Sequence, residues 1–160
     1  LLTFQKPKTR PDSLRIGGFL FASNTMLPRV NRLSSAQFER AFGRSQSVRH
    51  PLISLRVHRR FDDSKIVRAA FVVPKKQGKA TARNLVRRRL RERFRMHPLG
   101  QLLEGCDLIF LALPATHNAS IAQLDEAIGE VLNRAKIAQQ KAAGKRKSER
   151  ENASRVENSP

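Results

Sequence analysis

The segment 75–95 carries seven arginines and a single acidic residue, Glu92. A guanidinium group can hold a phosphate through two parallel hydrogen bonds, and its plane can stack on an unpaired base. Apolar side chains recur every four residues here, which predicts an amphipathic helix with one buried stripe, Ala82, Val86, Leu90 and Phe94. The opposite face carries Asn84, Arg87, Arg88, Arg91 and Arg95. The chemistry expected of this helix is therefore the binding of a polyanion.

The charge of the whole chain indicates the same chemistry. It has 32 lysine and arginine residues against 13 aspartate and glutamate residues, a formal net charge of +19. A charge of this size favours nucleic acid as the partner. No stretch reaches the roughly 18 to 20 apolar residues that cross a bilayer, and the apolar stripe is too narrow for an interfacial helix. We therefore expect no membrane partner.

The remaining reactive side chains do not form a protein active site. The four histidines, His50, His58, His97 and His117, are scattered, with no two at helical metal-ligand spacing. Asp62 and Asp63 are adjacent and are best explained as turn formers. A lone cysteine, Cys106, excludes a disulfide framework and a multi-cysteine zinc site, which suits a reducing cytoplasm. We expect no catalytic residue and no metal site in the protein itself.

The elements around the basic helix can be read from local patterns. Ser34 and Gln37 form a capping box for a helix that ends at Gly43 and stacks Phe38 on Phe42. These two rings are either core or the edge of a groove for an unstacked base. The last helix is capped by Ser120, and its buried stripe is expected to be Ile121, Leu124, Ile128, Val131 and Leu132.

Three strands are expected. Residues 52–58 and 66–73 alternate in polarity and form a predicted hairpin, with Arg56 and Arg68 on its outer surface. Pro74 ends the second strand, and Lys75 to Lys79 lead into the basic helix. Residues 107–113 are continuously apolar, which suits a strand covered on both faces and placed beside 66–73. The predicted fold is an α+β two-layer sandwich, in the order helix, strand, strand, helix, strand, helix, on a small mixed sheet.

The two ends differ in composition from the middle. Residues 1–25 mix basic residues and prolines with a short, glycine-broken apolar piece, and we interpret them as a disordered or spurious extension before Met26. Residues 26–137 form the expected domain. Residues 138–160 have almost nothing apolar after Ile137 and are expected to be a charged, disordered tail or frayed helix.

Two separated motifs resemble one known family. The string Gly78-Lys79-Ala80-x-x-Arg83-Asn84-x-x-Arg87-Arg88-x-x-Arg91-Glu92-x-Phe94-Arg95 is similar to the signature of the protein subunit of bacterial ribonuclease P. The string Asn31-Arg32-Leu33, followed by Phe38 and Phe42, resembles that family's first helix. The resemblance covers roughly Leu27 to Ala135, and such a match in two motifs and in element order is highly specific.

The resemblance implies a protein that binds a large catalytic RNA and the 5′ leader of precursor tRNA, while the RNA subunit removes the leader. It implies Mg²⁺ held mainly by RNA, a left-handed strand-helix-strand crossover, against the usual right-handed rule, and no DNA partner. The implied contacts to the catalytic RNA are Lys75, Lys76, Lys79, Arg83, Asn84, Arg87, Arg88, Arg91 and Arg95. The implied leader groove comprises Phe38, Phe42, Arg56 and Arg68.

Two positions depart from the family pattern. Leu85 stands where many members have a third basic residue, and Arg56 or Leu55 stands nearest the place of a frequent strand aromatic. Three other functions stay open from the residues alone. A structural, ribosomal-type RNA-binding protein would not stimulate leader cleavage, a DNA-binding helix would prefer duplex DNA to structured RNA, and a protein nuclease would be active without RNA.

Overall fold

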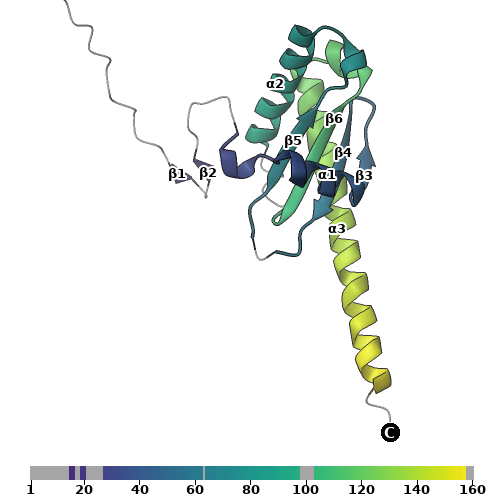
Figure 1. The fold of residues 1–160 in the computed structure, drawn as a ribbon. Helices are drawn as coiled ribbons and strands as arrows, with labels where there is room; N and C mark the ends of the chain where they lie inside the picture. The colour runs from purple at the N-terminus through teal and green to yellow at the C-terminus, as the bar shows by residue number, and fades with distance from the viewer. Residues whose placement is uncertain (1–14, 17–18, 21–26, 63, 98–102, 158–160) are drawn as a thin grey trace, which may run out of the picture.

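The computed structural model describes residues 15–16, 19–20, 27–62, 64–97 and 103–157, and its core is a four-stranded mixed sheet (Figure 1). The strands are β3 (Gln46–Arg49), β4 (Ile53–Arg59), β5 (Arg68–Val72) and β6 (Cys106–Ala112). Their order across the sheet is β3-β4-β6-β5. The helices are α1 (Ser35–Gly43), α2 (Ala80–Met96) and α3 (Ile121–Glu157). The predicted α+β class with a mixed sheet is confirmed.

The predicted hairpin between 52–58 and 66–73 is wrong. Strand β6 lies between these two strands, antiparallel to β4 from Ile53↔Ala112 to Arg59↔Cys106 and parallel to β5 from Arg68↔Asp107 to Val72↔Leu111. The reason is burial, because a strand that is apolar on both faces removes most apolar surface from water when it lies at the centre of the sheet. The predicted neighbour relation between 66–73 and 107–113, and the strand-helix-strand unit that follows from it, are confirmed.

One strand was not predicted at all. Strand β3 pairs antiparallel with β4, from Gln46↔Val57 to Arg49↔Ser54, and adds an edge to the sheet. Its sequence, Gln-Ser-Val-Arg, has one apolar residue and shows no alternation that would indicate a strand. At the other edge, residue Arg32 forms a parallel bridge with Ala69 of β5, and the side-chain amide of Asn31 donates to Val67 O at 2.8 Å.

Helices α2 and α3 pack on one face of the sheet, and α1 crosses the other face (Figure 1). The α2 face is centred on an aromatic cluster in which Phe94 meets Phe71 and Phe110, with ring centroids 5.8 and 5.1 Å away. Val86, Leu90 and Phe94 are buried, as predicted, whereas Ala82 is only half-buried. Burial of this stripe fixes the orientation of α2 and turns its basic face to solvent.

The predicted capping box of α1 is present, and the predicted cap of α3, Ser120, is part of a second capping box. Gln37 N donates to Ser34 Oγ at 3.4 Å, and Ser34 N donates to Gln37 Oε1 at 2.9 Å. Ser120 and Gln123 exchange the same pair of bonds at the start of α3. In α3, Leu124, Ile128, Val131 and Leu132 are fully buried, but Ile121 is 55 % exposed because it stands a turn before the first residue that packs on the sheet.

The end regions were only partly foreseen. Helix α3 continues to Glu157, over a region for which the sequence led us to expect a disordered tail or frayed helix. In the extension 1–25 the structure describes a two-residue antiparallel pair, β1 (Arg15–Ile16) and β2 (Phe19–Leu20). The remainder of 1–25, together with Met26, lies outside the described residues. Among the helices described, none combines the length and the apolar character that a membrane span needs.

Candidate nucleic-acid interface

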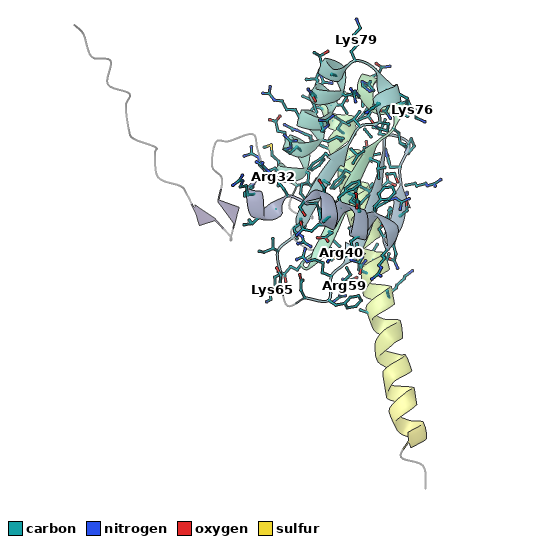
Figure 2. The ribbon with its side chains drawn as sticks, viewed as in Figure 1. Arg32, Arg40, Arg59, Lys65, Lys76 and Lys79 are labelled. Carbon is teal, nitrogen blue, oxygen red and sulfur yellow. The ribbon has the colours of Figure 1, made fainter. Side chains whose placement is uncertain are left out.

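The predicted RNA contacts follow one surface from the β5–α2 turn along α2. Pro74 precedes a 3-10 turn, Lys75–Gln77, and Gly78 follows it with a φ of 116°, a value that a glycine adopts without strain. Lys75, Lys76 and Lys79 are exposed on this turn, and Figure 2 shows Lys76 and Lys79 at the end of the domain where α2 begins. The turn therefore presents three ammonium groups in front of the helix.

Along α2 the predicted residues are not equally accessible. Asn84 and Arg88 are exposed, while Arg83, Arg87, Arg91 and Arg95 are half-buried. The buried Nε of Arg83 has no hydrogen-bond partner among the described residues. Leu85, which replaces a basic residue of the family pattern, is 50 % exposed. The basic face is thus continuous with the lysine turn but contains one apolar position.

Three guanidinium groups gather near the second half of α2. The pKa of Arg91 is lowered by burial and by the positive charges of Arg32 and Arg87. Arg32 is held in place by its Nε, which donates to Leu27 O at 2.7 Å. Positive charges that repel one another in the free protein are stabilised when an anion binds between them. Arg32 therefore joins the basic surface, although only its place in the Asn31-Arg32-Leu33 string could have indicated it.

One arginine of the helix has a different task. The guanidinium of Arg93 lies 3.4 Å from the carboxylate of Asp125 on α3 and 3.7 Å from that of Glu92. Arg93 therefore connects α2 to α3. Arg87, Arg88 and Arg91 lie on other sides of the helix and belong to its basic face. The division follows from the position of the apolar stripe, which places residues 93 and 87 on different sides of the helix axis.

The first helix and the sheet form an aromatic platform. Phe38 and Phe42 stack with centroids 5.6 Å apart, and both rings are half-buried. The Arg56 guanidinium lies 4.0 Å from the centroid of the Phe42 ring and donates to Phe42 O at 2.9 Å. Arg56 thus connects β4 to α1. It is also one of the two residues nearest to the strand position where the family often has an aromatic. Phe38, Phe42 and Arg56 are three of the four residues predicted for the leader groove, and we name these three the leader platform after that prediction.

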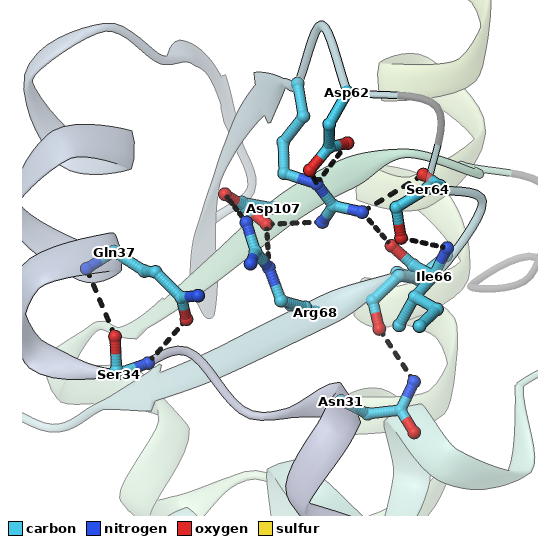
Figure 3. Close-up of polar contacts among 10 residues, drawn as sticks. Asn31, Ser34, Gln37, Asp62, Ser64, Ile66, Arg68 and Asp107 are labelled. Carbon is cyan, nitrogen blue, oxygen red and sulfur yellow. Dashed lines mark hydrogen bonds and ion pairs between the residues drawn. The ribbon is translucent and has the colours of Figure 1, made fainter.

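Arg68, the fourth residue predicted for the leader groove, is bound elsewhere. Its Nε and Nη2 donate to Asp107 at 2.7 and 2.9 Å, and Arg60 Nη1 donates to the same carboxylate at 2.7 Å (Figure 3). The structure therefore brings Phe38, Phe42 and Arg56 together and does not bring Arg68 to them. Asp107 was missed, although a carboxylate that opens a continuously apolar strand has to be paired when it is buried.

The Asp107 network also organises the loop after β4. Arg60 donates to both carboxylate oxygens of Asp62 and to the carbonyl oxygens of Ser64 and Ile66. Burial alone would lower the pKa of Arg60, but its bonds to Asp107 and Asp62 outweigh burial and raise that pKa. The same Arg60 bond lowers the pKa of Asp62. Asp62 thus stabilises the loop through its bonds with Arg60, in agreement with its prediction as a turn former.

The other singled-out side chains lie apart from these surfaces. His50 is 3.3 Å from the Glu130 carboxylate, His97 contacts Gly129 on α3, and burial raises the pKa of the Cys106 thiol. In the part of the chain that the structure describes, no three histidine, cysteine, aspartate or glutamate side chains gather as metal ligands would.

Similarity to known proteins identifies the family of this chain. The family model described as Ribonuclease P matches residues 27–136. The chain belongs to this family. Among curated relatives, the ribonuclease P protein component of Gluconacetobacter diazotrophicus is 34 % identical over 113 residues, covering 70 % of this chain and 97 % of that protein. The ribonuclease P protein component of Beutenbergia cavernae is 39 % identical over 102 residues, or 62 % and 83 % of the two chains.

Solved structures of the family share the fold. The Staphylococcus aureus RNase P protein at 2.0 Å superposes with a TM-score of 0.59 and 25 % identity, covering 68 % of this chain and 97 % of that one. The RNase P protein from Thermotoga maritima gives a TM-score of 0.56 at 25 % identity, covering 64 % and 96 %. This chain is thus a ribonuclease P protein component, part of an RNA-containing endoribonuclease of tRNA processing. Its α3 continues beyond the matched residues.

Proposed function

We propose that this chain is the subunit that binds the catalytic RNA of ribonuclease P through the lysine turn and the basic face of α2. The support is the rigid presentation of the cations, because the strand-helix-strand unit and the aromatic cluster fix α2 on the sheet. Arg32, Arg87 and Arg91, whose charges lie close to one another, suit the phosphates of a folded RNA.

The second half of the proposal concerns the substrate. The leader platform offers two stacked, half-buried rings of α1 and one guanidinium plane of β4, which suits unpaired bases rather than a duplex. We propose that it receives the single-stranded 5′ leader of precursor tRNA. The protein would then raise affinity for the precursor, while the RNA subunit and its Mg²⁺ ions break the phosphodiester bond. The proposal includes a cytoplasmic location.

Reconstitution tests this function. The purified chain is mixed with ribonuclease P RNA and a precursor tRNA at a low Mg²⁺ concentration, at which the RNA alone cleaves slowly. We expect the chain to accelerate release of the leader and to show no cleavage without the RNA. Binding to the RNA without any acceleration would favour a structural, ribosomal-type RNA-binding protein. Cleavage by the chain alone would contradict the assignment of catalysis to RNA.

A further inference from the structure

The distal part of α3 lies outside the matched family domain. The family model ends at residue 136, whereas α3 runs to Glu157. We name residues 138–157 distal α3. At about 1.5 Å per residue this part is about 30 Å long. Figure 1 shows it, at the yellow end of the chain, leaving the domain as a single rod, and for most of its length none of the other described helices and strands lies beside it.

Packing on the sheet ends where distal α3 begins. Ala135 is the last buried residue of α3, and none of the described side chains after it is buried. Gln139, Ala142 and Ala143 still line a hollow beside α1, while Lys141 is exposed. The face of distal α3 that contains Lys141 is therefore turned away from the domain.

The sequence of distal α3 does not suit an apolar partner. Four alanines and Val156 are its only apolar residues, and no large apolar residues recur at the heptad spacing of a coiled coil. A helix that lies on a membrane needs a wide apolar face as well as a charged one. Neither a second copy of this helix nor a bilayer is therefore the partner that the sequence favours.

The charge of distal α3 suits a polyanion. Six lysine and arginine residues stand against three glutamates. Helical spacing places residues 141, 145, 148, 152 and 155 on one face, which contains the exposed Lys141 and which we name the outward face. Its residues are Lys141, Lys145, Ser148, Asn152 and Arg155, and none of the three glutamates belongs to it. Ammonium, guanidinium, hydroxyl and amide groups are those with which proteins bind phosphate oxygens.

We propose that the outward face of distal α3 binds the phosphate backbone of ribonuclease P RNA, as a contact separate from the basic face of α2. This inference rests on the proposed function. Figure 2 shows Lys76 and Lys79 at one end of the domain, and distal α3 leaves the domain at the opposite end. Distal α3 therefore reaches a part of the folded RNA that the lysine turn does not contact. Phosphates carry no sequence information, so the contact raises affinity without selecting a sequence.

The catalytic RNA suits the outward face better than the tRNA does. Precursor and mature tRNA carry the same phosphates outside the leader, so a contact with those phosphates would hold the product as firmly as the substrate. A site of several phosphate contacts therefore suits the partner that stays bound through each round of cleavage.

A salt series with the whole chain tests the outward face. The variant K141Q/K145Q/R155Q removes three positive charges from this face. The matched control, R146Q/K147Q/R150Q, removes three from the other side of the same helix, and glutamine keeps the helix propensity in both variants. Affinity for labelled ribonuclease P RNA is measured by fluorescence anisotropy at increasing KCl concentrations. Each phosphate contact contributes about 0.7 to 0.9 to the slope of log affinity against log salt concentration, so we expect the outward-face variant to have a slope flatter by about 2.1 to 2.7. The control should change this slope less.

Directed cleavage identifies the RNA that the outward face contacts. In N152C an iron chelate that generates hydroxyl radicals is attached to residue 152, while the native Cys106, 3 % exposed, is shielded from the label. In the holoenzyme with precursor tRNA bound, we expect cuts in ribonuclease P RNA. Absence of cuts in that RNA, or equal slopes for the wild type and K141Q/K145Q/R155Q, would overturn this inference and leave the proposed function intact. A wild-type chain that does not accelerate release of the leader would instead remove the proposed function.

Discussion

Replacing Arg87 and Arg91 together by glutamine should weaken RNA binding without weakening the fold. Both side chains are half-buried on the face of α2 away from Asp125, one turn apart, and burial together with the positive charges of Arg32 and Arg87 lowers the pKa of Arg91. Like charges four residues apart on a helix cost about 0.2 to 0.5 kcal/mol. The double variant R87Q/R91Q should therefore unfold in urea at the wild-type midpoint or slightly above it.

The loss of RNA affinity can be given a magnitude. Each phosphate contact contributes about 0.7 to 0.9 to the slope of log affinity against log salt concentration. If both arginines contact phosphates, the slope of the double variant is flatter by about 1.4 to 1.8. Doubling the salt concentration then costs the variant about threefold less affinity than it costs the wild type.

The assay is fluorescence anisotropy of labelled ribonuclease P RNA across a series of KCl concentrations. Arg93 provides the control, because R93Q removes one positive charge from the same helix but on the side that contacts Asp125, whereas R87Q/R91Q removes two. We expect R93Q to keep most of the wild-type slope. Equal slopes for the wild type and R87Q/R91Q, or a larger change in R93Q than in R87Q/R91Q, would refute the assignment of the solvent face of α2 to RNA.

Three further predictions concern other parts of the molecule. D107N should lower the free energy of unfolding by about 3 to 5 kcal/mol, because two largely buried guanidinium groups lose their counterion. The control D62N, at an exposed carboxylate, should change urea unfolding little. A D107N urea midpoint equal to that of the wild type would contradict the network. G129A should stabilise the fold only in an H97A background, by about 1 kcal/mol, because a Cβ at residue 129 would lie 2.9 Å from His97 Nε2. Thermal melts of the two single variants and the double variant measure this, and an equal gain in melting temperature in both backgrounds would contradict the contact. F42A should reduce the preference of the holoenzyme for precursor over mature tRNA, because it removes one of the two stacked rings of the leader platform. Competition binding measures this, and an equal loss of affinity for the two RNAs would contradict the assignment of the leader to Phe38, Phe42 and Arg56.

The sequence predicted the local elements well because their causes are local. The stripe Val86, Leu90 and Phe94, the capping box at Ser34 and the cap at Ser120 depend on residues within one or two helical turns, and all of these are confirmed. The alternation in 52–58 also located β4 and its buried face.

The pairing of strands and the ion-pair network depend on partners far away in the chain. Nothing near residues 52–73 indicates that β6 inserts between β4 and β5, because the insertion is decided by total burial across the sheet. Asp107 lies 39 residues from Arg68 and 47 from Arg60, and no spacing rule links them. The placement of Arg68 outside the leader platform follows from this distant carboxylate. Strand β3 forms because β4 offers an open edge, whatever its own polar sequence favours.

The two margins of the sheet determine how the protein behaves toward copies of itself. The bridge of Arg32 to Ala69 and the bond of Asn31 to Val67 occupy backbone positions in β5 and directly before it that a second chain could otherwise join. On the far margin, β3 is four residues long and ends in an exposed arginine. Covered or short and charged margins discourage intermolecular strand addition. The protein should therefore resist aggregation during the interval between its synthesis and its capture by RNA.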